Sequence, residues 1–379
     1  MYRRLLKKPL DYNKSFFLFG PRGTGKTTWI KTNIKESIYL DLLSSDYYNL
    51  LISNPARLCD LIPSDYKSWI ILDEIQRVPE CLNEVHRLIE NKKYKFILTG
   101  SSARKLRKKG INLLGGRALT YHMHPLTALE LDDDFDIKKS LSYGNMPEVY
   151  NSPDPKHYLQ SYIQTYLREE VLQEGLTRSL VNFYRFLEIA SFSQGSNLNT
   201  SEIAREIGLD RSTIENHFAI LEDLLIAFRI PPFLRKAKRR LIKHSKFYFF
   251  DAGIFKAIRP KGPFDAPEEA EGPALETLCL QELQALNDYF NLEYKFYYWR
   301  TSHGVEVDIV LYGPRGLIAF EIKRSARFSN RDLKGLLSFK EDYPIAKCYF
   351  LYGGNIEEFH KDITVLPLTK AFTIFKEIL

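Results

Sequence analysis

A run of glycine, lysine and threonine residues near the start of the chain has the types and the spacing of a phosphate-binding loop. Residues 20–27 read GPRGTGKT, which fits the pattern G-x-x-x-x-G-K-[ST]. The glycines let backbone N–H groups approach phosphate oxygens that a Cβ atom would obstruct. Lys26 is expected to reach the β- and γ-phosphates of a nucleotide, and Thr27 to ligate Mg²⁺. The predicted phosphate-contacting set is Gly20, Pro21, Arg22, Gly23, Thr24, Gly25, Lys26, Thr27 and Thr28.

A pair of acidic residues follows an apolar run in the sequence WIILDE, residues 69–74. Such a run is typical of a buried parallel strand, and open α/β sheets bind ligands at the carboxyl ends of their strands. Asp73 is predicted to hold Mg²⁺, and Glu74 to polarise the water that attacks the γ-phosphate. The Asp-Glu pair favours nucleotide hydrolysis over kinase or switch-GTPase chemistry.

The elements that must position these residues are short strands and the helix that begins at Lys26. The sequence predicts strands at residues 16–19, 38–40, 69–74 and 96–100. Ser101 follows the last of these strands, where a polar side chain senses the γ-phosphate or positions the attacking water. Arg117, in a Gly-Gly-Arg sequence, is the first candidate for an arginine finger, with Arg104 second. A solvated surface charge remains the other interpretation for both arginines.

Five segments together resemble a family of prokaryotic AAA+-type ATPases whose C-terminal region has no assigned function. The segments are FGPRGTGKT, ILDEIQRVPE, LTGSSARKL, LLGGRALTYHMHPLTALEL and YGNMPEVY. The resemblance implies a P-loop fold of the ASCE class, in which a glutamate is catalytic, and ATP as the nucleotide. It also implies that Ser101 is the sensor-1 residue and Arg117 the finger.

Length and composition set limits on the rest of the chain. A chain of 379 residues predicts two or three domains, and 44% hydrophobic residues are typical of a globular protein. No apolar run approaches the about 18 residues of a membrane span, and four scattered cysteines fit a reducing cytoplasm. The net charge of +7 permits a nucleic-acid partner. We predict an ATPase domain at 1–150, a helical region with a winged helix at 151–260, and an α/β domain at 261–379.

The middle of the chain has a helix-turn-helix pattern over residues 199–230, in which Gly208 separates two amphipathic helices. Strands expected at 225–228 and 247–250 would form a wing, joined by the basic segment RKAKRRLIKHSK, which ends at Lys246. DNA-binding and protein-binding modules both use this fold, so both interpretations stay open. The candidate nucleic-acid contacts are Arg211, Ser212, Thr213, Asn216, Arg235, Lys236, Lys238, Arg239 and Arg240.

The last third of the chain combines a helix, predicted at 274–290 after a linker at 260–273, with a hairpin that carries acidic residues. Two-residue alternation places Asp308, Glu321 and Lys323 on one side of neighbouring strands. Two carboxylates suit a divalent metal, and a lysine can stabilise phosphorane charge. With Glu276 on the helix, this pattern is similar to the restriction-endonuclease-like fold. It predicts a nuclease-like site with a second divalent metal at Asp308 and Glu321, or an inactive relative that keeps these residues as salt bridges.

These patterns give three hypotheses for function. The first is a cytoplasmic AAA+-like protein that binds and hydrolyses ATP and couples it to DNA or RNA binding or processing. The second is an ATP-dependent switch that acts through protein association, as a homo-oligomer or with a protein partner, and has an inactive nuclease-like fold. The third is a metal-dependent nuclease gated by the ATPase. No membrane partner is expected.

Overall fold

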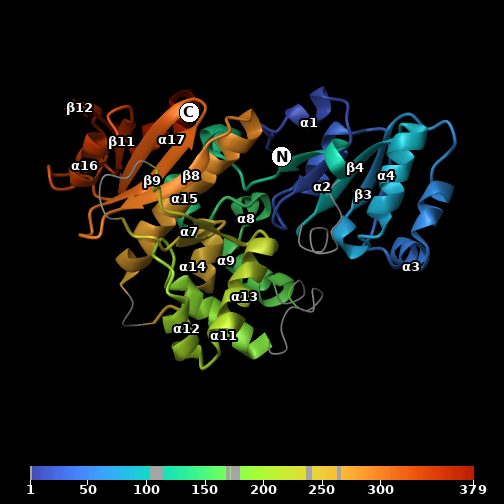
Figure 1. Ribbon diagram of the computed structural model, residues 1–379, viewed down its shortest axis with the longest axis horizontal. Coiled ribbons are helices and arrows are strands. Elements are labelled where there is room, and N and C mark those ends of the chain that lie inside the picture. Colours follow the sequence, from blue (N-terminus) through green and yellow to red (C-terminus); the bar gives the residue numbers. More distant parts are fainter. Residues whose placement is uncertain (1, 103–113, 168–170, 172–179, 236–240, 263–265) are drawn as a thin grey trace. The chain divides into compact units, whose positions relative to one another are not determined.

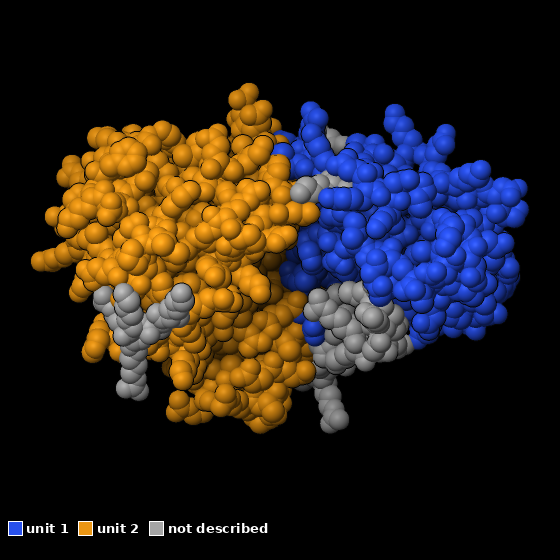
Figure 2. Space-filling view, turned by 45° about the horizontal axis from the view of Figure 1, so that its top comes forward, with its two compact units in different colours: residues 1–125, 223–225 blue, residues 126–222, 226–379 orange. Residues whose placement is uncertain are grey.

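The computed structural model describes residues 2–102, 114–167, 171, 180–235, 241–262 and 266–379. These residues form two compact units (Figure 2): unit 1 comprises residues 1–125 and 223–225, and unit 2 comprises 126–222 and 226–379. Among the described residues, no helix is both long and apolar enough to cross a membrane.

Unit 1 contains a five-stranded sheet (Figure 1) whose strands are β1 (Phe16–Phe19), β2 (Ser37–Asp41), β3 (Trp69–Asp73), β4 (Lys95–Gly100) and β5 (Leu119–His122). Their order is β2-β3-β4-β1-β5, and every neighbouring pair is parallel. β4 therefore lies between β1 and β3, so the carboxyl ends of these three strands meet at one edge of the sheet. The four predicted strands are present, whereas β5 was not predicted.

The helices of unit 1 pack on this sheet around a core that is almost fully buried. All four side chains of β1 are buried, and so are Ile70, Leu72, Phe96 and Leu98 from the neighbouring strands. This continuous apolar content is typical of a parallel sheet that is covered on both faces. The helices are α1 (Lys8–Asp11), α2 (Lys26–Asn33), α3 (Ser45–Ser53) and α4 (Cys81–Lys92), with 3₁₀ helices at η1 (Pro55–Leu61), η2 (Ile75–Arg77) and η3 (Leu114–Gly116).

The first part of unit 2 is a set of short helices, two of which begin at prolines. The helix-turn-helix region follows, and Gly208 separates its two helices at a φ of 77°. Asn199 caps the first of them by accepting the backbone N–H of Glu202. The helices are α6 (Ala128–Leu131), η4 (Asp132–Asp134), α7 (Ile137–Tyr143), α8 (Pro147–Asn151), α9 (Pro155–Ser161), η5 (Tyr162–Leu167), α11 (Leu180–Ser191), α12 (Thr200–Ile207), α13 (Arg211–Asp223) and α14 (Ala252–Ile258).

Two antiparallel strands, β6 (Ala227–Ile230) and β7 (Lys246–Phe249), follow the helix-turn-helix helices. β6 begins two residues later than predicted because Leu225 has a φ of 59°, a left-handed conformation that ends the preceding helix and cannot join a strand. β7 begins at Lys246, so this lysine belongs to a buried strand. The prediction that Lys246 belongs to the basic segment before the second strand was wrong.

The C-terminal part of unit 2 is a six-stranded mixed sheet in the order β12-β13-β11-β10-β9-β8. The neighbours β8, β9 and β10 are antiparallel, whereas β10 pairs with β11, and β11 with β13, in parallel. The strands are β8 (Lys295–Arg300), β9 (Glu306–Gly313), β10 (Gly316–Lys323), β11 (Lys347–Tyr352), β12 (Glu358–His360) and β13 (Ile363–Pro367), and the helices are α15 (Pro267–Phe290), α16 (Lys334–Asp342) and α17 (Leu368–Ile378).

Helix α15 starts seven residues before the predicted position, so the prediction of a linker was wrong for residues 267–273. Pro267 occupies the first turn, where its fixed φ suits a helix and its missing N–H costs no bond. Glu268 and Glu269 add negative charge at the positive end of the helix dipole. Pro273 lies inside the helix, and the Thr277 hydroxyl donates to its carbonyl at 2.6 Å.

Candidate functional site

The predicted phosphate-binding loop joins the end of β1 to the start of α2. Gly25 caps α2 with a φ of 89°, a conformation that favours glycine. Lys26 is 6% exposed, and its ammonium donates to the carbonyl oxygens of Gly20 at 2.7 Å and Pro21 at 3.2 Å. A Cβ atom at Gly20 would lie 2.3 Å from the carbonyl oxygen of Met123. The loop therefore has the compact backbone and the inward lysine that an anion cradle requires.

Asp73, at the end of β3, is the centre of a hydrogen-bonded group. Thr27 Oγ1 donates to Asp73 Oδ2 at 3.0 Å, so the two residues predicted to hold Mg²⁺ lie side by side. The hydroxyls of Tyr39 and Thr99, from β2 and β4, also donate to this carboxylate. Burial and the hydrogen bond to Asp73 raise the pKa of Tyr39 above its usual value. Sequence reasoning missed Tyr39 and Thr99, although both lie near the ends of strands beside β3.

Glu74 follows β3 and is held by two polar side chains. Gln76 Nε2 donates to Glu74 Oε2 and, at 3.1 Å, to Ser101 Oγ, which lies 3.3 Å from the same carboxylate oxygen. The backbone N–H of Glu74 donates to Thr99 Oγ1 at 3.1 Å. Glu74 has a φ of 61°, and such strain in a non-glycine residue is frequent at functional sites. The structure thus brings Glu74 and Ser101 together, and it adds Gln76, which the sequence did not indicate.

The arginine predicted as a finger pairs with an acid on the same unit. The Arg117 guanidinium contacts the carboxylate of Glu90 on α4, and both side chains are partly exposed. The hydrogen bond to Arg117 lowers the pKa of Glu90. Arg104 lies outside the described residues. The finger function of Arg117 stays a prediction.

The helix-turn-helix residues differ in how free their side chains are to contact a ligand. Arg211 is exposed and lies 3.7 Å from Glu215, one turn later in α13. The hydroxyls of Ser212 and Thr213 donate to Asp210 at 2.5 and 2.6 Å, so they help to fix the start of α13. Asn216 is exposed on the same helix. The Arg235 guanidinium lies over the Tyr312 ring, and Lys236, Lys238, Arg239 and Arg240 lie outside the described residues.

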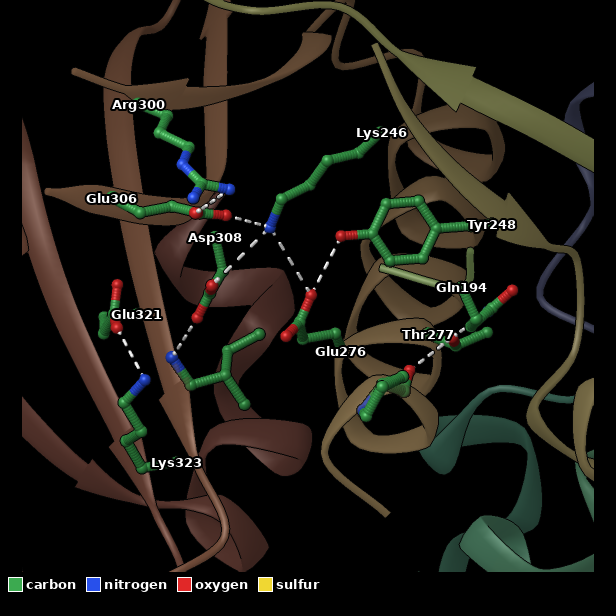
Figure 3. A network of polar contacts seen from close by, with 12 residues as sticks. Gln194, Lys246, Tyr248, Glu276, Thr277, Arg300, Glu306, Asp308, Glu321 and Lys323 are labelled. Atoms are coloured by element: carbon green, nitrogen blue, oxygen red, sulfur yellow. Dashed lines mark hydrogen bonds and ion pairs between the residues drawn. The ribbon is translucent and has the colours of Figure 1, made fainter. Parts of the chain in front are cut away.

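In the C-terminal part of the chain, acidic side chains surround a buried lysine (Figure 3). Lys246 is 3% exposed, and its ammonium lies 3.8 Å from Glu276 Oε2 on α15 and 3.9 Å from Asp308 Oδ1 on β9. It also contacts Glu306 Oε1 on β9. We call Lys246, Glu276, Glu306 and Asp308 the lysine–acid cluster. Tyr248, on the same strand as Lys246, donates to Glu276 Oε2 at 2.9 Å.

The predicted E-x-K pair lies on β10, next to this cluster. The pairing of β10 with β9 ends at Phe320 and Ile309, and Glu321 and Asp308 are the next residues along these two strands. Lys323 Nζ lies 2.9 Å from Glu321 Oε1, and Asp308 Oδ2 accepts the backbone N–H of Ile322 at 2.9 Å. Burial and the nearby Asp308 raise the pKa of Glu321 well above its usual value. All four predicted nuclease-like residues therefore lie in one region, on α15, β9 and β10.

The side chains of this region do not fit a divalent metal as they are arranged. Within the described part of the chain, no group of three or more His, Cys, Asp or Glu side chains could hold a metal ion. Asp308 is engaged by a backbone N–H and faces an ammonium, and the Oε1 atom of Glu321 is paired with Lys323, which leaves only its Oε2 atom without a partner among the described residues. Divalent cations need free oxygen ligands at about 2.0–2.6 Å. We therefore derive no chemistry from a second metal at Asp308 and Glu321.

The pKa of Glu276 leads to a pH-dependent stability. Burial, and then the charges of Asp308 and Glu306, raise this pKa from 4.5 to about 7, against the opposing effects of Lys246 and the Tyr248 hydroxyl. The folded state therefore holds a proton that the unfolded chain releases above pH 4.5. The free energy of unfolding of unit 2 should fall as pH rises from about 4.5 to about 7, by at most about 3 kcal/mol. Above pH 7 this contribution should stay constant.

Calorimetric melting between pH 5 and pH 8 measures this effect. The Glu276→Gln variant should lose the part of the pH dependence that Glu276 contributes, because glutamine does not titrate, whereas the contribution of Asp251, whose pKa burial raises to about 6, should remain. Glu268→Gln, at an exposed position on the same helix, should leave it unchanged. Identical pH profiles for the wild type and Glu276→Gln would show that Glu276 is ionised throughout this range.

Comparison with known proteins identifies the domain class of the first part of the chain. It also finds relatives that align over most of the chain. The sequence model of an AAA domain family matches residues 12–131. This match covers the phosphate-binding loop, the acidic pair and the tip of β4, so this part is a P-loop, ATP-binding domain of the AAA type. Two families, described as domains of unknown function DUF8612 and DUF4143, match residues 134–265 and 271–371.

The alignments with the relatives extend over most of this chain and are not confined to its first domain. An uncharacterized protein of Mycobacterium tuberculosis is 24% identical over 362 residues, which cover 92% of this chain and 79% of the relative. One from Methanocaldococcus jannaschii is 24% identical over 333 residues, 79% of this chain and 73% of the relative. The Aeropyrum pernix ORC1 protein in complex with DNA aligns at 15% identity and a TM-score of 0.26, over 65% of this chain and 86% of that one. At that TM-score the structural likeness carries no inference.

Proposed function

We propose that the chain is an ATP-hydrolysing AAA+-type protein of the ASCE class that couples its nucleotide state to nucleic-acid binding. The hydrogen-bonded group at the edge of the unit 1 sheet carries the ATPase part of this proposal. Lys26, Thr27, Asp73, Glu74 and Ser101 come from three elements and meet where the carboxyl ends of β1, β3 and β4 converge. This is the set that phosphate binding and water activation require.

Each residue has a distinct part in the proposed reaction. Backbone N–H groups of the loop and the Lys26 ammonium bind the phosphates of ATP. Thr27 and Asp73 are the residues that would hold Mg²⁺, which when bound neutralises charge on the phosphate oxygens. Glu74 accepts a proton from the attacking water, and Gln76 and Ser101 orient its carboxylate.

The nucleic-acid part of the proposal is supported by the exposed surface of α13. A helix that follows a glycine turn and precedes a two-stranded sheet is the arrangement that winged-helix proteins place in a major groove. Arg211 and Asn216 are exposed on this helix. The basic segment between β6 and β7 would add phosphate contacts, which give a salt-dependent affinity.

Fluorescence anisotropy of a labelled DNA duplex tests this part. We expect binding that weakens steeply between 50 and 200 mM salt, and a loss of about 10-fold or more in affinity for the double variant Arg211→Ala, Asn216→Ala. Arg57→Ala removes the same charge from an exposed residue of unit 1 and should leave the affinity unchanged. Affinity that does not change in the double variant would contradict a role of α13 in DNA binding.

The lysine–acid cluster favours a second candidate function, a nucleotide-dependent switch that acts through protein association. In that case the C-terminal sheet is an inactive restriction-endonuclease-like fold and serves as a binding surface. The absence of DNA affinity at low salt, together with ATP-dependent association in light scattering, would favour this candidate over the first.

A further inference from the structure

Lys246 combines deep burial with a high local density of acidic side chains. Its side chain is 3% exposed, the lowest value among the residues that form the ion pairs of this region. Burial opposes its charge, but the Glu276, Asp308 and Glu306 carboxylates hold the pKa of Lys246 well above its usual value. A buried ammonium is tolerated only where it is paired in this way. Lys246 is therefore a cation fixed inside the fold.

The carboxylates nearest Lys246 are shared between two cations. Lys246 and Arg300 are the cations, and Arg300 lies 3.3 Å from Glu306 Oε2. Glu306 and Asp308 balance these two charges, and Glu276 is the surplus acid. The ammonium lies between carboxylates of α15 and β9, in the space that a divalent ion would need in order to reach both elements (Figure 3).

We propose that Lys246 is the resident cation of the lysine–acid cluster and takes the place that a divalent cation would occupy between Glu276, Glu306 and Asp308. As long as β7 holds Lys246 in this position, the C-terminal sheet binds no metal ion. The sheet then does not hydrolyse nucleic acid. The cluster becomes a site for a hard divalent cation only when the ammonium is removed. This inference does not depend on ATP hydrolysis, so either proposal can fail without the other.

The glutamate beside the cluster supports this inference independently. Glu321 is 7% exposed, and its Oε2 atom has no hydrogen-bond partner among the described residues. Glu321 lies on β10, the strand next to β9, and directly follows Phe320, which pairs with Ile309. An unpartnered buried oxygen beside a displaced ammonium supplies an additional ligand of the kind that Mn²⁺ and Mg²⁺ prefer.

Binding of Mn²⁺, measured by electron paramagnetic resonance on the full chain without nucleotide, tests the proposal. The wild type and Asp308→Asn should bind Mn²⁺ equally, because Asp308 is not available while Lys246 is present. Lys246→Met should gain one Mn²⁺ per chain, bound at least about 10-fold more tightly than by the wild type. The double variant Lys246→Met, Asp308→Asn should lose this gain. Lys243→Met, an exposed lysine in the same segment, is the matched control for the change in charge and should gain nothing.

Two results would overturn the proposal. One is Mn²⁺ binding by the wild type that Asp308→Asn reduces, and the other is a folded Lys246→Met protein that gains no site. Where Lys246→Met does not fold, the comparison of wild type with Asp308→Asn still decides. Cleavage of labelled DNA with Mn²⁺ gives a second readout: activity of the wild type that Lys323→Ala abolishes would show a working metal site and contradict the inference.

Discussion

The Glu74→Gln variant is expected to hydrolyse ATP at least about 100-fold more slowly than the wild type, with ATP binding retained. Glutamine keeps the shape of the side chain but cannot accept a proton, and general-base catalysis contributes about 10²–10⁴-fold to such reactions. The groups that bind phosphate and metal, Lys26, Thr27 and Asp73, are untouched by the change. The expected loss therefore appears in kcat rather than in nucleotide affinity.

Phosphate release under saturating ATP and binding of a fluorescent ATP analogue measure the two effects separately. Lys26→Ala should lose binding, since its ammonium closes the loop through Gly20 and Pro21. Glu36→Gln, at an exposed position, should match the wild type in both assays. A Glu74→Gln protein with more than about a tenth of wild-type turnover would exclude Glu74 as the base. A wild type without turnover would contradict the proposed ATPase itself.

The phosphate-binding half of this site could be predicted from sequence because its signal is local. Residues 20–28 are contiguous, and the run before Asp73 is apolar enough to define a strand without knowledge of its neighbours. The contacts of Tyr39, Thr99 and Gln76 could not be predicted in the same way. They depend on the order of the strands, which places β4 between β1 and β3, and no single segment contains that order.

In the C-terminal region, too, a local pattern predicted some residues of the site, and contacts from a distant segment could not be predicted. Strand alternation was enough to predict Asp308 and Glu321 on one side of β9 and β10, which pair up to Phe320 and Ile309, the residues next to them. The alternation said nothing of Lys246, because this residue reaches the carboxylates from β7, a strand of another sheet. In the sequence, Lys246 is one of several basic residues close together, and nothing there distinguishes it from Lys243, which is exposed in the structure whereas Lys246 is buried.

The segment YGNMPEVY was part of the family resemblance, and the structure gives it a structural explanation. Asn145, which follows Gly144, donates its backbone N–H to Asp251 Oδ2 at 2.8 Å and its side-chain amide to the Leu126 carbonyl at 2.9 Å. Asp251 is fully buried and caps α14 by accepting the backbone N–H groups of Gly253 at 2.8 Å and Ile254 at 3.1 Å. One carboxylate thus joins the segment to the helix.

Asp251→Ala is expected to destabilise unit 2 by about 3–5 kcal/mol, because three buried backbone N–H groups lose their acceptor at about 1–3 kcal/mol each, with partial additivity. Urea unfolding followed by circular dichroism, with calorimetry to resolve the transitions, measures the loss. Asp136→Ala removes a capping aspartate from the start of α7 at an exposed position, and it should cost only about 1 kcal/mol. Equal losses for the two variants would show that Asp251 stabilises the protein only as a helix cap, and that its hydrogen bond with Asn145 adds nothing.

A double-mutant cycle with Gly144 tests whether Gly144 and the Asp251 carboxylate affect the free energy of unfolding through their mutual contact. Gly144 has a φ of 74°, and a Cβ atom there would lie 1.8 Å from Asp251 Oδ1. Gly144→Ala should therefore be severe in the wild type, since both the backbone and the carboxylate resist it. In the Asp251→Ala background the carboxylate is gone, and only the backbone strain should remain, about 1–3 kcal/mol, because a φ of 74° with a ψ of −173° is a conformation that essentially only glycine adopts. The two losses should consequently sum to more than the loss in the double variant, because the overlap with Asp251 is counted only while that side chain is present. Strict additivity would mean that Gly144 is required for its conformation alone.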